Sequence, residues 1–76
     1  MENVEELLLK LGTNLRQLRI KKRFSQTDIQ QRTGLSIRTL CLLERGDIDP
    51  KFSTLCKVAD ALGISVEKIF KINLIK

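Results

Sequence analysis

The sequence has no histidine and only two cysteines among 76 residues, which leaves few side chains that could bind a metal. Two thiols without an imidazole and without a CxxC spacing do not make a zinc site, so we expect no metal and no other cofactor. A disulfide between Cys41 and Cys56 is one interpretation, but small secreted domains usually carry more cysteines. The favoured interpretation is two reduced thiols in a cytoplasmic protein.

Groups that catalyse reactions are as scarce as metal ligands. The chain contains no histidine, no glycine-rich phosphate-binding loop and no cluster of carboxylates. A reaction centre needs several such groups held together, and none can be assembled from this sequence. We therefore predict that the protein is not an enzyme and that it has no catalytic residue.

Long apolar runs are also missing. No stretch approaches the length that a membrane-spanning helix needs. The first residues include Glu2, Glu5 and Glu6, whereas a secretion signal would begin with basic residues. These absences predict a cytoplasmic protein without a membrane partner.

The charge of the chain is strongly biased toward bases. The net charge is +5 and the pI is about 9.6, which favours nucleic acid, an anionic membrane or an acidic protein as the partner. Between residues 7 and 27 the chain has no acid but six bases, which are Lys10, Arg16, Arg19, Lys21, Lys22 and Arg23. Since apolar residues make up 42% of the sequence, it suits a folded globule rather than a disordered tail.

The stretch 25–46 has the pattern of two short helices joined by a tight glycine turn. Ser25 and Asp28 have the spacing of a capping box, and Gly34 suits the left-handed conformation that ends a helix. Ser36 is placed to cap the second helix. Because the turn is too short for antiparallel packing, the two helices should cross steeply. This arrangement is a helix-turn-helix, whose second helix can enter the major groove of DNA.

The segment before this stretch is predicted to be mostly helix, over residues 1–23. Apolar residues recur at steps of four and three and share one face, namely Val4, Leu8, Leu11, Leu15 and Leu18. Gly12 interrupts the run, so we expect a kink or two helical pieces there. Leu7 and Leu9 lie off the stripe and either cover a neighbouring part of the domain or form a dimer contact.

Two more helices are predicted after Gly46. Asp49 and Pro50 suit the start of a helix, and Ser65 is placed to cap a last short one. The expected inner residues are Phe52, Leu55, Val58, Ala59 and Leu62 in the fourth helix and Val66, Ile69 and Phe70 in the fifth. The tail 71–76 is either a frayed helix end or a small strand.

These elements make an all-α protein with a compact five-helix fold. We expect one domain over residues 1–76, with a helix-turn-helix core at 25–46, an N-terminal helical extension at 1–10 and a C-terminal tail at 71–76.

The order of the motifs resembles the phage-repressor-like (Cro-type, XRE-type) helix-turn-helix family. The resemblance rests on LRQLR, SQTDI, TGLS, LERG, LCKVADALGIS and VEKIF, which follow one another at the family's spacing. It implies a lambda-repressor-like DNA-binding domain in a bacterial or phage transcriptional regulator. Such proteins usually act as homodimers on a palindromic operator in double-stranded DNA.

The resemblance also implies roles for single residues. Gln26 matches the glutamine that bonds a DNA phosphate, and Arg19 and Glu44 match an internal ion pair between the first and third helices. The other phosphate contacts that we expect are Arg23, Arg45, Lys51 and Ser53.

The helix at 36–45 should present its outer face to the bases. The side chains expected there are Ser36, Ile37, Arg38, Cys41 and Leu42. Arg38 is the best candidate for reading a base, because a guanidinium bonds guanine in two places. Ile37 and Leu42 depart from the family, which usually has polar or basic residues there, and they suit thymine methyls.

Two functions are consistent with this sequence. The favoured one is a sequence-specific transcriptional regulator, a repressor, that reads the major groove as a dimer. The alternative is a protein-binding module such as an antitoxin of a toxin–antitoxin pair, which the apolar Ile37, Cys41, Leu42 and N-terminal leucines suggest. For a dimer contact the sequence offers the N-terminal leucines or the segment 70–75, of which we favour the second.

Overall fold

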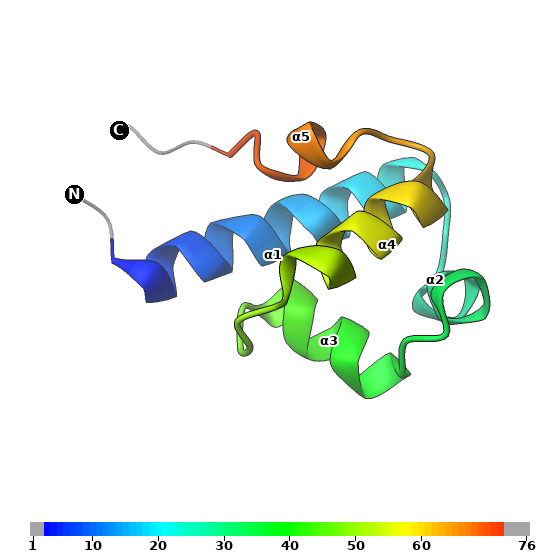
Figure 1. Cartoon of the computed structure of the whole chain (residues 1–76), viewed down its shortest axis with the longest axis horizontal. Coiled ribbons are helices and arrows are strands. Elements are labelled where there is room, and N and C mark those ends of the chain that lie inside the picture. The colour runs from blue at the N-terminus through cyan, green and yellow to red at the C-terminus, as the bar shows by residue number, and fades with distance from the viewer. Residues whose placement is uncertain (1–2, 73–76) are drawn as a thin grey trace.

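A computed structural model describes residues 3–72 of the chain, and these residues form five α-helices (Figure 1). The helices are α1 (Val4–Lys21), α2 (Gln26–Thr33), α3 (Ile37–Arg45), α4 (Phe52–Leu62) and α5 (Val66–Ile69). Within 3–72 there is no strand, so the all-α, five-helix prediction is confirmed. The part of the predicted tail at 73–76 lies outside the described residues.

Helix α1 forms the long axis of the molecule, with α3 on one side of it and α5 on the other (Figure 1). Helix α4 lies across the front of α1, and α2 connects to α3 at the far end from the termini. Helix α1 therefore contacts α3 of the helix-turn-helix and the C-terminal helix α5, and positions them relative to each other.

The predicted kink at Gly12 is wrong, because α1 is one helix of 18 residues that passes through this glycine. Gly12 is buried against the end of α3. A Cβ atom there would lie 2.4 Å from the carbonyl oxygen of Leu43 and 2.6 Å from that of Glu44. The glycine thus serves close packing of two helices rather than a break in one.

The core joins all five helices. Its buried residues are Leu11 and Leu15 of α1, Ile29 of α2, Leu40 and Leu43 of α3, Leu55, Val58, Ala59 and Leu62 of α4, and Ile69 of α5. Burial of an aliphatic side chain of this size stabilises a fold by about 1.5–3 kcal/mol before entropic costs. The buried residues of α2 and α3 fix these two helices to the rest of the molecule.

Three predicted inner residues are exposed instead: Val4 at 61%, Phe52 at 61% and Phe70 at 44%. Val4 lies in the first turn of α1, whereas the buried residues of this helix are Leu11, Gly12 and Leu15. Phe52 is the first residue of α4 and Phe70 follows the single turn of α5, so both project from helix ends. Their rings stack on each other with centroids 6.2 Å apart.

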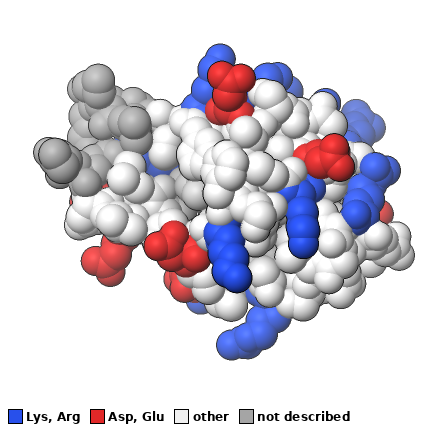
Figure 2. Space-filling view, viewed as in Figure 1, with Lys and Arg blue, Asp and Glu red and all other residues white. Residues whose placement is uncertain are grey.

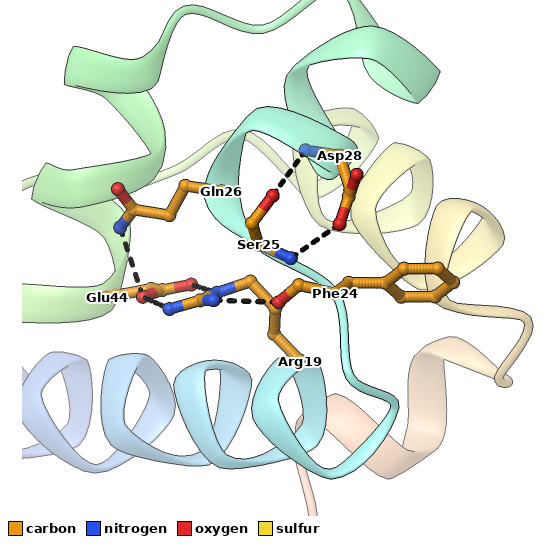
Figure 3. Close-up of polar contacts among 6 residues, drawn as sticks. All are labelled: Arg19, Phe24, Ser25, Gln26, Asp28 and Glu44. Carbon is orange, nitrogen blue, oxygen red and sulfur yellow. Dashed lines mark hydrogen bonds and ion pairs between the residues drawn. The ribbon is translucent and has the colours of Figure 1, made fainter.

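The helix caps agree with the sequence in α2 and α3. Asp28 N–H donates to Ser25 Oγ at 3.0 Å, and Ser25 N–H donates to Asp28 Oδ2 at 2.7 Å, which completes the predicted capping box (Figure 3). The carboxylate of Asp28 accepts hydrogen bonds from the backbone N–H and then from the side chain of Ser25, and these lower the pKa of Asp28. Ser36 caps α3 by accepting from Thr39 N–H at 3.0 Å.

The predicted helix starts at Asp49–Pro50 and Ser65 need correction. Helix α4 begins two residues after Pro50, with Lys51 before it and no side-chain hydrogen bond to its first N–H groups. Ser65 does precede α5, but its hydroxyl makes no capping bond. The backbone enters both helices from an extended residue, so the local geometry forms without a side-chain cap.

We predict that Gly12→Ala destabilises the protein by about 1–3 kcal/mol, the usual cost of overpacking. An alanine in a helix would otherwise gain about 1 kcal/mol over glycine, so packing and propensity act in opposite directions here. Urea unfolding measures the difference. Thr13→Ala, at the exposed neighbouring position, is the control and should cost nothing. A Gly12→Ala protein as stable as the parent would contradict the close contact with α3.

Candidate nucleic-acid interface

Helices α2 and α3 cross steeply, as the short turn predicts. In Figure 1, α2 is seen nearly end-on, whereas α3 lies along the plane of the view. Gly34 ends α2 with a φ of 78°, a left-handed conformation that favours glycine. Thr33 Oγ1 donates to the Ile29 carbonyl at 2.7 Å and accepts from Leu35 N–H at 3.1 Å, which ties the turn to α2.

The two ends of α3 differ in their surroundings. Its C-terminal end lies against α1, where the backbones of Leu43 and Glu44 approach Gly12. Its first turn points away from α1 and forms the lower edge of the molecule (Figure 1). The start of α3 is therefore the part of the helix that can enter a groove without a clash with α1.

The predicted ion pair between α1 and α3 is present in the structure (Figure 3). Arg19 Nε lies 2.6 Å from Glu44 Oε2, and Arg19 Nη2 donates to Glu44 Oε1 at 3.0 Å. Both side chains are mostly buried, with 14% and 9% of their surfaces exposed. Arg19 Nη1 also donates to the Phe24 carbonyl at 2.8 Å, so one guanidinium holds three elements together.

The hydrogen bond from Arg19 to Glu44 raises the pKa of the arginine, and the opposite charge of Glu44 adds to it, while burial acts in the other direction. The contact with Glu44 therefore favours the charged form of the arginine. An ion pair of this burial stabilises only while both partners are present, because removing one leaves the other charge unpaired.

Gln26 contacts this ion pair. Its Nε2 donates to Glu44 Oε1 at 3.2 Å from the first residue of α2 (Figure 3). The contact fixes the amide beside the N–H groups at the start of α2, which favour anions. The phosphate contact that we expect of Gln26 stays a prediction, and sequence reasoning missed the contact with Glu44.

The five residues expected to touch bases lie on α3 and just before it. Ser36 and Arg38 are exposed, whereas Ile37, Cys41 and Leu42 are half-buried. The hydroxyl of Ser36 accepts from Thr39 N–H, which caps the helix, and it donates to Thr39 Oγ1. Of the five, Arg38 offers the most accessible hydrogen-bond donors, and it lies in the first turn of α3.

The remaining expected phosphate contacts are exposed but separated. Arg23 follows α1 in a left-handed conformation with a φ of 63°, and Lys51 and Ser53 flank the start of α4. Arg45 Nη2 lies 3.1 Å from Asp47 Oδ2 in a solvent-exposed ion pair, and this pair reduces the positive charge at the end of α3.

Most of the face in Figure 2 is uncharged, and separate lysine and arginine side chains project from its upper, right-hand and lower edges. Acidic side chains lie singly at the top and right of centre, and several gather at the lower left, over the start of α1 and the α3–α4 loop (compare Figure 1). The charge of this face is therefore least favourable to nucleic acid at the end of the molecule that carries the start of α1.

Two further side chains that the sequence did not single out join separate elements of the fold. The guanidinium of Arg32 lies 4.5 Å from the centroid of the Phe24 ring, a cation–π contact between α2 and the loop before it. Asn14 Nδ2 donates to the carbonyls of Lys68 and Ile69 at 2.9 and 2.7 Å, which attaches α5 to α1. A signal for either contact is absent from the sequence, because each joins separate helices or loops.

Residues 3–72 contain no group of three or more side chains that could hold a metal ion. No helix in this part of the chain is long and apolar enough to span a bilayer. Cys41 and Cys56 are both free thiols, each half-buried.

Comparison with known proteins gives the same fold and places the chain in a family. The family model described as "Helix-turn-helix" (HTH_3) matches residues 15–69, which include the Arg19–Glu44 pair and all of α2 and α3. The chain belongs to this helix-turn-helix family. It is a DNA-binding transcriptional regulator of the HTH_3 type.

Relatives of this HTH_3 protein include regulators of known sequence and structure. An uncharacterised HTH-type transcriptional regulator, y4dJ, from Sinorhizobium fredii is 40% identical over 55 residues, which are 72% of this chain and 71% of the relative. The crystal structure of the restriction-modification controller protein C.AhdI from Aeromonas hydrophila has a TM-score of 0.80 and 33% identity, and the match covers 83% of this chain and 96% of that one. The clp gene regulator ClgR from C. glutamicum has a TM-score of 0.81 and 31% identity, over 84% and 82% of the two chains.

We predict that Glu44→Ala costs about 3 kcal/mol or more of unfolding free energy, because it leaves the mostly buried Arg19 without its partner. The double change Arg19→Met with Glu44→Leu should recover much of that loss, because both charges are then gone. Chemical denaturation of the parent and both variants measures the two values. A cost near zero for Glu44→Ala would show that solvent, rather than Glu44, stabilises the arginine.

Proposed function

We propose that this HTH_3 protein is a sequence-specific repressor in the cytoplasm that binds a palindromic operator as a homodimer. The observation that carries the proposal is the projecting first turn of α3, where Arg38 is exposed while Leu40 and Leu43 hold the helix in the core. A guanidinium at such a position suits the two acceptors of guanine in the major groove. Ile37 and Leu42, half-buried beside it, suit contact with thymine methyls.

Phosphate contacts would orient α3 in the groove. Gln26 begins α2 next to free helical N–H groups, and Arg23 and Lys51 are exposed on either side of the helix-turn-helix in the sequence. Contacts of this kind fix the position of a protein on the duplex but carry no sequence information. Discrimination between sites would therefore depend on α3.

The small number of base pairs that one α3 helix can contact favours a dimer, and occupancy of the DNA by that dimer favours a repressor role. One short helix reads too few base pairs to select a site in a genome, and a pair related by two-fold symmetry reads two half-sites about 34 Å apart. A small regulator bound across such a site blocks access to the DNA beneath it, which is repression by occupancy. The chain would act by binding and not by catalysis.

The direct test is selection of bound duplexes from a random pool, by the parent protein and by Arg38 variants. The parent should recover a two-fold symmetric consensus with a guanine in each half-site. Arg38→Ala should lose the preference at that base pair, a discrimination of about 1–3 kcal/mol for a two-bond contact. Arg38→Lys keeps the charge but not the planar fork, so it should lose the same preference while it keeps more affinity.

Lys68→Ala is the control for charge alone, because Lys68 is an exposed base on α5, across α1 from α3 (Figure 1). It should leave the consensus unchanged. No enrichment by the parent, or an Arg38→Ala consensus identical to the parent's, would contradict base reading by this arginine.

A further inference from the structure

A polar groove of about 340 Å³ lies beside α1, where the chain continues past α5. Its walls include Leu9, Lys10, Thr13 and Gln17 of α1, and Lys71 and Ile72, which follow α5. Pockets that bind small molecules begin at about 300 Å³. Among the residues that the structure describes, none of those expected to contact DNA lines this groove, so it is a surface separate from the candidate nucleic-acid interface.

The two walls of the groove are fixed to each other. Lys10, Asn14 and Gln17 follow one another at steps of four and three residues and therefore share one face of α1. Asn14, which also lines the groove, donates from Nδ2 to the carbonyls of Lys68 and Ile69 at 2.9 and 2.7 Å. These carbonyls lie at the end of α5. The groove is therefore formed before a ligand arrives, as is usual for binding pockets.

The polar groups of the groove suit an anion. A lysine ammonium group only donates hydrogen bonds, and the amide of Gln17 and the hydroxyl of Thr13 also have donors. Thr13, Gln17 and Lys71 are exposed, so a ligand from solvent reaches them. Among the described residues that line the groove there is no Asp or Glu. A cation would therefore meet like charge here, whereas an anion would meet opposite charge and several donors.

The groove also has an apolar part. Leu9, which is 53% exposed, lines it from α1, and the half-buried Ile72 lines it from the other wall. An inorganic anion would leave this apolar part uncovered. A purely apolar ligand would displace water from the charged and polar groups without replacing its hydrogen bonds. The combination fits a ligand with an anionic group at one end and an aliphatic chain at the other.

We propose that this groove binds a small organic anion that carries an aliphatic chain, such as a short-chain carboxylate. The inference goes beyond the proposed function, because the site is separate from α3 and needs no DNA. A ligand that contacts both α1 and the segment after α5 recognises the folded chain, so it also stabilises the fold.

Titration of the isotope-labelled chain with hexanoate, at low salt and without DNA, tests the inference by NMR. We expect saturable shifts, with a dissociation constant in the millimolar range, at the backbone amides of Thr13 and Lys71 and at the side-chain amide of Gln17. Inorganic phosphate lacks the aliphatic chain and hexanol lacks the charge, so each should bind about fivefold more weakly or worse.

Lys71→Ala should raise the dissociation constant of hexanoate about fivefold, because it removes a cationic group from the groove. Lys68→Ala is the matched control, since Lys68 is also an exposed lysine but its side chain does not line the groove. The control should leave the affinity for hexanoate unchanged.

Shifts that do not saturate, or that lie away from the groove, would overturn the inference. So would an affinity that Lys71→Ala leaves unchanged, or one that Lys68→Ala weakens equally, because charge attraction alone would then explain it. Phosphate or hexanol that binds as tightly as hexanoate would contradict the proposed class of ligand. Since the titration uses no DNA, a failure of operator selection would refute the proposed function and leave this result unaffected.

Discussion

The ion pair between Arg19 and Glu44 is the interaction on which the arrangement of the DNA-binding helices depends. It joins α1 to the end of α3, and the same guanidinium binds the Phe24 carbonyl while Gln26 binds the carboxylate (Figure 3). Charges that are 14% and 9% exposed lose most of their hydration, so each needs the other. The cost of breaking the pair makes one position of α2 and α3 on α1 strongly preferred.

Close packing between α1 and α3 fixes the position of α3 together with the ion pair. Gly12 allows the backbone of α3 to touch α1, and Leu40 and Leu43 fill the space beneath α3. With its last turn fixed in this way, α3 presents its first turn to solvent as a rigid element. Rigid positioning suits base reading, because a side chain that is already in place loses less entropy when it binds. The proposed function thus rests on a helix whose inner face is held in the core while Arg38 in its first turn is exposed to solvent.

Much of the fold followed from local rules in the sequence. The period of Leu55, Val58 and Leu62 predicted one buried face, and Ser25 with Asp28 predicted a capping box, because both depend on neighbours along the chain. Periodicity does not show where a helix ends, so Phe52 and Phe70 were wrongly placed in the core. Gly12 was misread because its partner, the backbone of α3, is distant in the sequence. For the same reason, the contact of Gln26 with Glu44 could be found only in the structure.

The most direct test of this account is DNA affinity in the Arg19→Met, Glu44→Leu double variant, in which the net charge is unchanged. The account holds that Glu44 both stabilises α3 and orients Gln26, so the variant should regain stability yet bind a selected duplex about tenfold more weakly, a loss of roughly 1.4 kcal/mol. Gln26→Ala should weaken binding by the parent protein and have little further effect in the double variant. Full recovery of both stability and affinity, with Gln26→Ala equally harmful in both backgrounds, would contradict a role for Glu44 in positioning Gln26.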